Sequence, residues 1–314
     1  MMSLRPLGST HLAVAPLCLG GNVFGWTADE AASFAVLDAY TAAGGNFVDT
    51  ADGYSAFVPG HKGGESETVL GRWFKARGNR SDVVLASKVG RHPEYQGLSA
   101  GNIRAAADAS LRRLQTDYID LYYTHYDDPD VPVEEIIGTL DGLVRAGKVR
   151  HIAASNISAE RLRASLEFSE REGLARYVAL QPHYSLVSRD TYEGALQDVA
   201  EDAGLSAVPY FALASGFLTG KYRPGATVDS VRAGRVAQLV DTERGARVLK
   251  ALDEIAGARE VEIATVALAW LAARPTVLAP TASARTVEQL PALLAVGEVT
   301  LTEEETTRLA EASA

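Results

Sequence analysis

Short apolar runs typical of β-strands alternate with segments of helical periodicity along the whole 314-residue chain. Over 103–114, for example, apolar side chains recur at three- and four-residue spacing, with arginines on the other face. Eight such strand–helix units, without a break in composition, predict an α/β protein with a single (β/α)8 TIM-barrel domain over residues 1–314. We expect its strands at 14–20, 46–50, 83–88, 119–124, 149–154, 177–182, 205–211 and 276–280.

A doubly wound parallel sheet is the alternative fold for this alternation. Sheets of that kind that bind dinucleotides usually show Gly-x-Gly-x-x-Gly after the first strand. Neither this pattern nor the phosphate-binding Gly-x-x-x-x-Gly-Lys-Ser/Thr occurs in the sequence. The segment Leu19-Gly20-Gly21-Asn22 indicates only a tight turn. The absence of both motifs therefore favours the barrel.

Capping patterns and glycines predict several helix boundaries. Residues 27–30 and 302–305 both read Thr-x-x-Glu, the form of a capping box, and predict two helix starts. Glycines at 44–45 and at 147 stand where helices would end before the next strand. The segment 213–247 is long, rich in glycine and arginine, and weakly periodic. It predicts a barrel loop that could fold over a ligand.

Charge and composition narrow the class of partner. The net charge of −10 argues against a nucleic-acid partner, which would require a basic surface. The sequence shows neither an apolar signal core at its N-terminus nor a run approaching the ~20 apolar residues of a membrane span. The lone Cys18 suits a reducing compartment. We expect a cytoplasmic protein with a small-molecule substrate and no membrane partner; the oligomeric state cannot be read from the sequence.

Three of the expected strands run into four residues of the types that carbonyl reduction requires. The strand at 46–50 reaches Asp49, and Tyr54 follows in the next turn; two further strands close on Lys88 and His125. The carboxyl ends of barrel strands meet at one face, so these four side chains should lie together. Each alone has an ordinary explanation, such as a turn tyrosine or a structural histidine. Their occurrence at strand ends of one barrel favours catalysis.

Each of these residue types has a task in ketone reduction. A free tyrosine, with a pKa of ~10, is a weak acid at neutral pH. A neighbouring Lys88 ammonium would lower the pKa of Tyr54 and make it a better proton donor. Asp49 would keep Lys88 charged and oriented, and the His125 imidazole would donate a hydrogen bond to the substrate oxygen. No metal is needed, and no two of the six histidines lie at ligand spacing.

The chain resembles the aldo-keto reductase family almost from end to end. Residues 44–54, which read GGNFVDTADGY, are similar to the family's second-strand motif, and 64–67 with 70–71 continue it. Residues 111–122 lead to His125 as the family's pattern does. The resemblance implies NADP(H)-dependent reduction of an aldehyde or ketone to an alcohol by hydride transfer. It also implies a catalytic tetrad with Tyr54 as general acid, made of Asp49, Tyr54, Lys88 and His125.

The resemblance further implies a set of residues that bind the nicotinamide cofactor. The pair at 155–156 and the glutamine at 181 are similar to the residues that hold the nicotinamide carboxamide. The tyrosine at 210 corresponds to the ring stacked on the nicotinamide, and 213–216 to the loop around the pyrophosphate. The residues implied in cofactor binding are Ser155, Asn156, Gln181, Tyr210, Leu213, Ser215, Gly216, Lys221, Ser283, Arg285 and Gln289.

The choice between NADP and NAD depends on Arg285. Residues 283–290 resemble the family's adenosine-phosphate segment, and the planar guanidinium of Arg285 could bind a 2′-phosphate through paired hydrogen bonds. A solvent-exposed arginine at a helix start is an equally good explanation. The chain has Leu293 where the family often has asparagine, and 210–213 read YFAL instead of YSPL. We expect NADP (NADPH), with NAD possible.

The expected substrate residues are mostly aromatic. Val23, Phe24 and Trp26 follow the first strand and Tyr126 follows His125, so we expect these four at the mouth of the site. Such a rim fits an apolar or mixed carbonyl compound, and no cluster of arginines marks a phosphorylated or carboxylated one. Two alternatives remain open: an NAD-linked sugar or polyol dehydrogenase on the same barrel, and a nicotinamide-binding regulatory subunit with little turnover.

Overall fold

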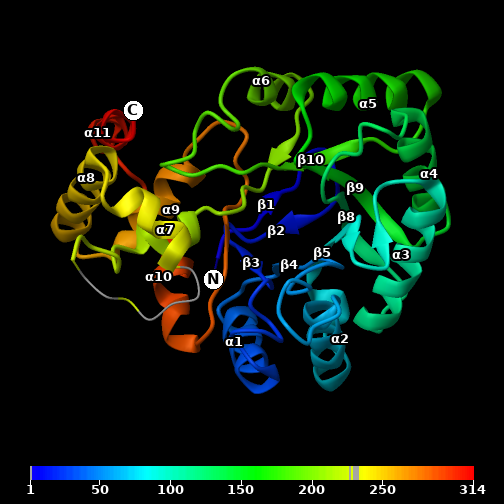
Figure 1. The fold of residues 1–314 in the computed structure, drawn as a ribbon, viewed down its shortest axis with the longest axis horizontal. Helices are drawn as coiled ribbons and strands as arrows, with labels where there is room; N and C mark the ends of the chain where they lie inside the picture. The colour runs from blue at the N-terminus through cyan, green and yellow to red at the C-terminus, as the bar shows by residue number, and fades with distance from the viewer. Residues whose placement is uncertain (1, 226–227, 229–232) are drawn as a thin grey trace.

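The protein is an α/β (β/α)8 barrel of parallel strands with helices between them (Figure 1). The computed structural model describes residues 2–225, 228 and 233–314. The sheet has the order β11-β10-β9-β8-β5-β4-β3-β12, and a parallel bridge between Ala207 and Val277 joins its two edges. The strands of the sheet are β3 (Cys18–Gly20), β4 (Phe47–Asp49), β5 (Val84–Val89), β8 (Ile119–Thr124), β9 (Val149–Ser155), β10 (Tyr177–Gln181), β11 (Ser206–Ala207) and β12 (Thr281–Ala282).

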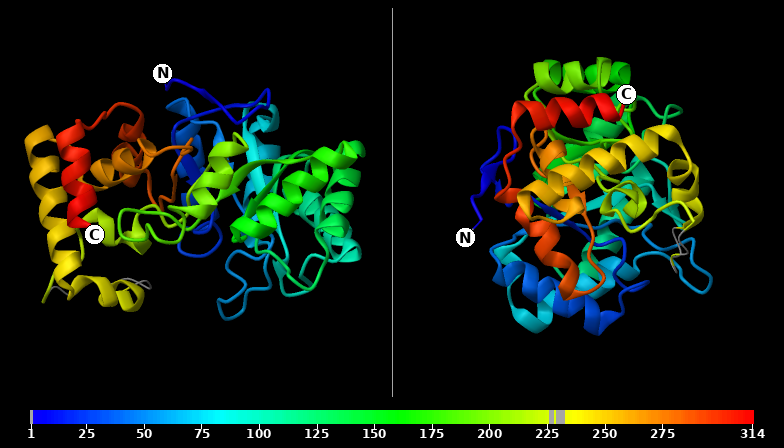
Figure 2. Two further views of the ribbon diagram at one scale, coloured as in Figure 1. Left: turned by 90° about the horizontal axis from the view of Figure 1, so that it is seen from above. Right: turned by 90° about the vertical axis from the view of Figure 1, so that its left-hand side faces the viewer.

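The helices form the outer layer around these strands, and Figure 2 shows α8 and α11 packed side by side at one edge. Within the described residues, no helix is long and apolar enough to cross a membrane. The helices are α1 (Glu30–Ala42), α2 (Glu65–Arg77), α3 (Ala100–Leu114), α4 (Val133–Arg145), α5 (Ala159–Glu172), α6 (Ala195–Asp202), α7 (Ala233–Val240), α8 (Glu243–Arg259), α9 (Ile263–Ala272), α10 (Leu290–Leu294) and α11 (Glu303–Ala312).

An N-terminal hairpin closes the amino end of the barrel. Its strands β1 (Arg5–Pro6) and β2 (Ala13–Val14) pair antiparallel. Leu7 and Leu12 are buried in the same apolar cluster as Phe47 and other side chains of the barrel interior. The predicted first strand, 14–20, is therefore wrong as one element, because the chain passes from the hairpin into β3. The hairpin fills one end of the barrel and leaves the carboxyl ends of the strands for the site.

The strands after position 200 are shorter than the sequence predicted. The expected strand at 205–211 is limited to Ser206–Ala207, and the one at 276–280 is replaced by the bridge at Val277 and β12. Pro209 and Pro280 explain part of this, because proline has no N–H for the sheet and interrupts its hydrogen-bond ladder. By contrast, β5 and β8 are buried along their whole length and lie within one residue of their predicted bounds.

The structure tests the predicted helix boundaries. Thr302 and Glu305 form the capping box at the start of α11, as predicted. The start of α1 differs, because Asp29 and not Thr27 is the N-cap, with its carboxylate accepting from the N–H of Ala32 at 2.8 Å. Glycines 44 and 147 follow α1 and α4 with φ of 90° and 72°, as expected for helix ends.

The segment 213–247 is more helical than predicted. It contains a 3₁₀ segment at Ala214–Thr219, then α7 and the beginning of α8. The loop prediction is wrong for the second half, where Val236 is buried and Thr242 caps α8 by accepting from the N–H of Gly245. Residues 226–227 and 229–232 of the predicted loop lie outside the described residues.

Candidate active site

Asp49 is the centre of the predicted tetrad. It ends β4, is completely buried, and accepts hydrogen bonds from three side chains. Lys88 Nζ lies 2.6 and 2.7 Å from its two carboxylate oxygens, the Tyr54 hydroxyl donates to Oδ2 at 2.8 Å, and Gln181 Nε2 donates to Oδ1 at 2.9 Å. These contacts join four segments of the chain at the carboxyl end of the barrel.

Lys88 lies in β5 and is also buried. Besides Asp49, its ammonium donates to the carbonyl oxygen of Thr50 at 2.8 Å and to the hydroxyl oxygen of Tyr54 at 2.7 Å. Burial lowers the pKa of Lys88, and the charge of Asp49 acts in the opposite direction. The ammonium therefore contacts both the carboxylate and the phenol, as the sequence predicted.

The pKa of Tyr54 moves in the direction opposite to the prediction. Burial raises the pKa of Tyr54 well above its usual value, and the charge of Asp49 raises it further. The expected lowering by Lys88 is not seen, because Asp49 is bonded to the same ammonium and also accepts the phenol proton. Tyr54 is thus protonated at neutral pH and keeps a proton to donate.

His125 completes the group of four. Its ring lies edge-on to that of Tyr54, with centroids 5.9 Å apart and an interplanar angle of 78°. Burial lowers the pKa of His125 well below its usual value, and the positive charges of Lys88 and Arg91 add to this effect. The imidazole is therefore neutral at physiological pH, with one N–H to donate. Its Nδ1 is buried and has no hydrogen-bond partner among the described residues.

Asn156 follows β9 and forms hydrogen bonds with residues at or beyond the ends of neighbouring strands. Its φ of 48° lies in the left-handed region, where asparagine is more tolerated than most residues. Its Nδ2 donates to the His125 carbonyl at 2.8 Å and to Ser155 Oγ at 3.0 Å, while the Tyr210 hydroxyl donates to its Oδ1 at 2.6 Å. Ser155 Oγ in turn donates to the Gln181 carbonyl at 2.8 Å. The four residues expected around the nicotinamide amide are therefore in mutual contact.

Tyr210 presents an aromatic ring beside these amides. It is stacked on His183, with centroids 5.3 Å apart and an interplanar angle of 24°. Burial raises the pKa of Tyr210 to about 12, and the neighbouring Tyr126 contributes. The ring is thus fixed by its stacking partner and by the Asn156 hydrogen bond, next to the tetrad.

The turn at 213–216 has strained backbone and a cation beside it. Ala214, Ser215 and Gly216 have φ of 47°, 58° and 99°. The N–H groups of Ala214 and Gly216 are bonded inside the turn, so they are not available to a ligand. Lys221 lies next to Gly216, where an added Cβ would be 3.7 Å from its Nζ. The positive charge at this turn comes from Lys221.

The residues of the predicted adenosine-phosphate segment lie near the first strand's loop. Ser283 Oγ donates to Asn22 Oδ1 at 2.5 Å, and Gln289 Oε1 accepts from the N–H of Arg285 at 2.9 Å. Arg285 is exposed, and its guanidinium has no ion-pair partner in the part of the chain that the structure describes. Leu293 is buried in the hydrophobic core.

The predicted donor set fits a nicotinamide dinucleotide in its chemistry. Two side-chain amides, a serine and an aromatic ring lie beside the tetrad, and cationic side chains stand at 221 and 285. Amides suit a carboxamide, and ammonium and guanidinium groups suit phosphates. Leu213, at the start of the turn, is half-buried.

The expected substrate residues do not all reach the mouth. Tyr126 is 44% exposed and Trp26 is half-buried, edge-on to Phe57 with centroids 5.2 Å apart. Val23 and Phe24 are only 1% and 0% exposed, and they pack in the hydrophobic core. Their expected place at the mouth is wrong, because the 21–28 turn folds their side chains inward. The sequence analysis missed two other residues of this region, Arg91 and Phe211.

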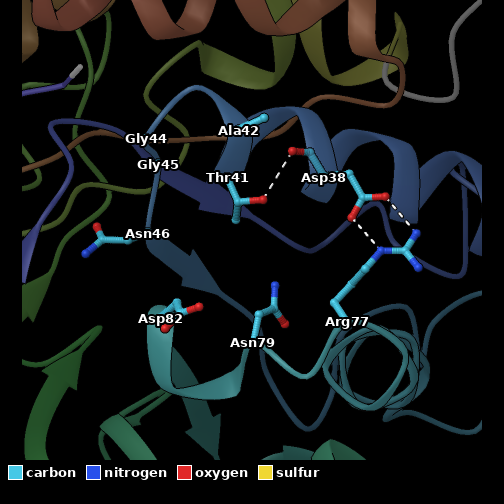
Figure 3. A pocket seen from close by; sticks show the side chains of 9 residues that line it. All are labelled: Asp38, Thr41, Ala42, Gly44, Gly45, Asn46, Arg77, Asn79 and Asp82. Atoms are coloured by element: carbon cyan, nitrogen blue, oxygen red, sulfur yellow. Dashed lines mark hydrogen bonds and ion pairs between the residues drawn. The ribbon is translucent and has the colours of Figure 1, made fainter.

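Two open depressions lie at the opposite end of the barrel. One, of ≈ 550 Å³, is between the ends of α1 and α2 beside the Arg77–Asp38 ion pair (Figure 3). The other, of ≈ 660 Å³, is between α2 and α3 and includes Tyr118. Neither contains a residue of the predicted site.

The chain matches the model of the Aldo/keto reductase family over residues 16–314. This protein belongs to that family. Members of the family are oxidoreductases that generally use a nicotinamide cofactor, and the protein is an NAD(P)-dependent aldo-keto oxidoreductase.

Curated relatives support the same assignment. The chain is 35% identical to "Uncharacterized oxidoreductase YrpG" of Bacillus subtilis (strain 168), over 96% of this chain and 93% of the relative. It is 34% identical to "Norsolorinic acid reductase stcV" of Emericella nidulans, over 96% of this chain and 78% of that protein. "Protein tas" of Escherichia coli (strain K12) is 35% identical over 72% of each chain. The shared region includes the whole barrel for the first two.

Proposed function

We propose that the protein reduces an aldehyde or ketone to an alcohol with NADPH, and that Tyr54 is the general acid. The observation that carries this proposal is the Tyr54 hydroxyl, which lies 2.7 Å from Lys88 Nζ and 2.8 Å from Asp49 Oδ2. A phenol between an ammonium and a carboxylate, next to a neutral imidazole, is suited to proton transfer near neutral pH.

The tetrad residues would divide the proton chemistry among them. When bound, the cofactor would supply the hydride for the carbonyl carbon. Tyr54 turns its proton from Asp49 to the carbonyl oxygen as negative charge develops there. The Lys88 ammonium stabilises the resulting phenolate, and the neutral His125 donates a hydrogen bond to the same oxygen.

The cofactor would be held by residues from three strand ends and the loops beyond. Ser155, Asn156 and Gln181 would bind the carboxamide, which requires Asn156 and Gln181 to exchange their present bonds to Tyr210 and Asp49. Lys221 and Arg285 would bind the phosphates. An arginine at position 285 favours NADP over NAD, because its planar guanidinium can bind two oxygens of a 2′-phosphate. The remaining residues implied by the family resemblance, Leu213, Ser215, Gly216, Ser283 and Gln289, would contact the dinucleotide through the two segments that carry these cations.

The relatives' names support reduction as the direction of the reaction. One relative is named as a reductase of norsolorinic acid, and its alignment with this protein covers 96% of the chain. This favours carbonyl reduction over the oxidation of a sugar or polyol. Trp26, Phe57 and Tyr126 offer aromatic surfaces to a substrate of this kind.

The test is Tyr54→Phe, with 4-nitrobenzaldehyde as substrate. Loss of the proton donor should lower kcat by at least about 100-fold. A fluorescence titration should show NADPH affinity close to that of the unaltered protein, because the phenol does not hold the cofactor. Tyr118→Phe, at the other end of the barrel, is the matched control and should leave kcat unchanged. Turnover retained in Tyr54→Phe would exclude Tyr54 as the acid.

The cofactor preference has its own test. Arg285→Gln should raise the KM for NADPH about tenfold, since a charge-assisted pair to the 2′-phosphate is lost. The KM for NADH should not change, because NADH has no such phosphate. Equal losses with both cofactors would remove Arg285 as the discriminating residue. Tight NADPH binding by the unaltered protein without turnover of any carbonyl would favour the regulatory-subunit alternative.

A further inference from the structure

A short hairpin after β5 brings an arginine to the mouth of the site. Its strands are β6 (Arg91–His92) and β7 (Tyr95–Gln96). Arg91 is exposed, and its guanidinium carbon lies 4.8 Å from the centroid of the Tyr126 ring. Among the residues described by the structure, no carboxylate forms an ion pair with it.

Arg91 is close to the residues that would transfer the proton. A Cβ added to Gly53, the residue before Tyr54, would be 2.6 Å from the Arg91 carbonyl oxygen, so the two backbones are in contact. The Tyr126 ring that lies under the guanidinium is 5.4 Å from the ring of His125. The charge of Arg91 contributes to lowering the pKa of His125, which shows that its field reaches the tetrad.

The two aspartates that follow Tyr126 in the chain have other partners. Asp127 forms a paired hydrogen bond with Arg161 at 2.9 Å. Asp128 accepts from the backbone N–H of Leu98 at 3.0 Å. The positive charge of Arg91 is therefore not neutralised by the loop that it covers, and a ligand anion could supply that neutralisation.

Exposed aromatic side chains lie in three loops at the carboxyl end of the barrel, and one of them, Tyr126, is in contact with Arg91. Phe57, Tyr126 and Phe211 are 68%, 44% and 39% exposed and lie in the loops that follow β4, β8 and β11. Exposed aromatic surface gathered around a polar group is typical of a ligand site. The combination of flat apolar walls and one cation fits a planar ring that bears an anion.

We propose that Arg91 is a specificity-determining residue that binds a carboxylate on the substrate, so that aryl aldehydes and aryl ketones with an acidic substituent are the preferred substrate class. The guanidinium can bind both oxygens of a carboxylate while the aryl ring packs on Tyr126, the aromatic side chain next to it. This inference rests on the proposed carbonyl reduction and adds the substrate class to it.

The experiment compares 4-carboxybenzaldehyde with its neutral analogue methyl 4-formylbenzoate at low ionic strength. In Arg91→Gln, kcat/KM for the acid should fall about fivefold, the upper range for an exposed ion pair, mainly through KM. The value for the ester should not change. Arg91→Lys should keep part of the preference, and rising salt should reduce it in the unaltered protein. Arg112→Gln, which removes an exposed arginine of α3, should leave the ratio unchanged.

Two results would overturn the inference in different ways. An acid-to-ester ratio that is the same in Arg91→Gln and in the unaltered protein, with normal ester turnover, would exclude Arg91 as the carboxylate site and leave the proposed reduction intact. No turnover of either aldehyde would count against the proposed reduction itself. Calorimetric binding of 4-carboxybenzyl alcohol then decides on Arg91, with a fivefold weaker affinity in Arg91→Gln as support and equal affinities as refutation.

Discussion

Asp49 and Asp120 are two buried carboxylates bonded to cations at opposite ends of the barrel. Asp49 ends β4 and binds Lys88 at the carboxyl end of the sheet. Asp120 is the second residue of β8 and binds Arg80 and Arg150, each at 2.7 Å, near the amino end. Similar ion pairs thus lie within one sheet, and their surroundings differ.

The difference lies in the cation and in what else it contacts. Arg80 and Arg150 lie over the ring of Tyr118, with guanidinium carbons 4.1 and 4.0 Å from its centroid. Arginine stays charged at any physiological pH, so this group can only hold structure. Lys88 is titratable, and it contacts a phenol that can release a proton. The two ion pairs therefore differ in whether the cation can itself lose a proton: Lys88 can, and the two arginines bonded to Asp120 cannot.

Strained backbone also distinguishes the two ends of the barrel, because most of it lies at the carboxyl end. Of the described non-glycine residues with positive φ, Gln115 and Glu260 cap the ends of helices α3 and α8, where this conformation is common. Most others lie in loops at the carboxyl end, where strained residues are often functional. These are Ser55, Asn156, Phe211, Ala214 and Ser215.

Lys88→Met should have the largest effect of the substitutions that probe this comparison. We expect kcat for 4-nitrobenzaldehyde to fall by at least about 100-fold, because the phenolate of Tyr54 loses its stabilising charge. The pH–rate profile should also shift. Steady-state kinetics across pH measures both. An unchanged profile with a normal kcat would mean that this ion pair is structural, like the one at Asp120.

Asp120→Asn should have the opposite effect to Lys88→Met, with stability lowered and kcat maintained. The free energy of unfolding should fall by about 3 kcal/mol, because the largely buried Arg80 loses its countercharge. Urea denaturation measures this loss. The kcat of the folded variant should stay within about twofold, since the tetrad is at the other end of the barrel. A large loss of kcat with normal stability would contradict the division between the two ends.

Asp52 is a third buried carboxyl, and it extends the comparison because it has no ion pair in the described part of the chain. Among the described residues it has no cation partner and accepts from the N–H of Gly90 at 3.1 Å. Burial and the neighbouring Glu67 raise the pKa of Asp52 to about 7. Between pH ~4 and 7 the native state therefore holds a proton that the unfolded chain releases.

The stabilising contribution of Asp52 is consequently complete at low pH and is lost as pH rises to about 7. Asp52→Asn, which is neutral at every pH, should flatten this dependence and raise the melting temperature at pH 8 relative to the unaltered protein. Thermal unfolding followed from pH 4 to 8 measures the effect. Parallel curves for the two proteins would show that Asp52 is ionised throughout.

Arg150→Gln should have the smallest effect. The Arg150 side chain is 42% exposed, so water screens its pair with Asp120, and Arg80 remains as a partner. We expect a loss of about 0.5 kcal/mol in the free energy of unfolding and no change in kcat. Urea denaturation beside Asp120→Asn makes the comparison. A loss as large as that of Asp120→Asn would mean that the exposed arginine is the main partner.

The elements that the sequence predicted well are those with long buried runs. β5 and β8 are buried throughout and mostly apolar, and they carry Lys88 or lead to His125, so both the strands and their chemical residues were visible. The short β11 and β12 were overestimated because their neighbouring apolar residues pack in the core without pairing as strands. Helix α7 was missed because its eight residues make only about two turns, too short a stretch to show helical periodicity within a glycine- and arginine-rich segment.

Properties that depend on contacts between segments could not be predicted. The direction of the pKa shift of Tyr54 follows from its hydrogen bond to Asp49, which no local pattern shows. Val23 and Phe24 look like loop residues in sequence, and only the turn that contains them directs them inward. Arg91 reads as one of many arginines until the hairpin places it over Tyr126.

The hydrogen bond between Gln181 and Asp49 joins residues 132 positions apart in the chain. Contacts of such separation form late when a protein folds, because a long loop must first close. The tetrad is therefore assembled only when β4 and β10 belong to one sheet. During refolding, enzyme activity should therefore return later than the helical signal. The time at which activity returns would measure when the barrel is complete.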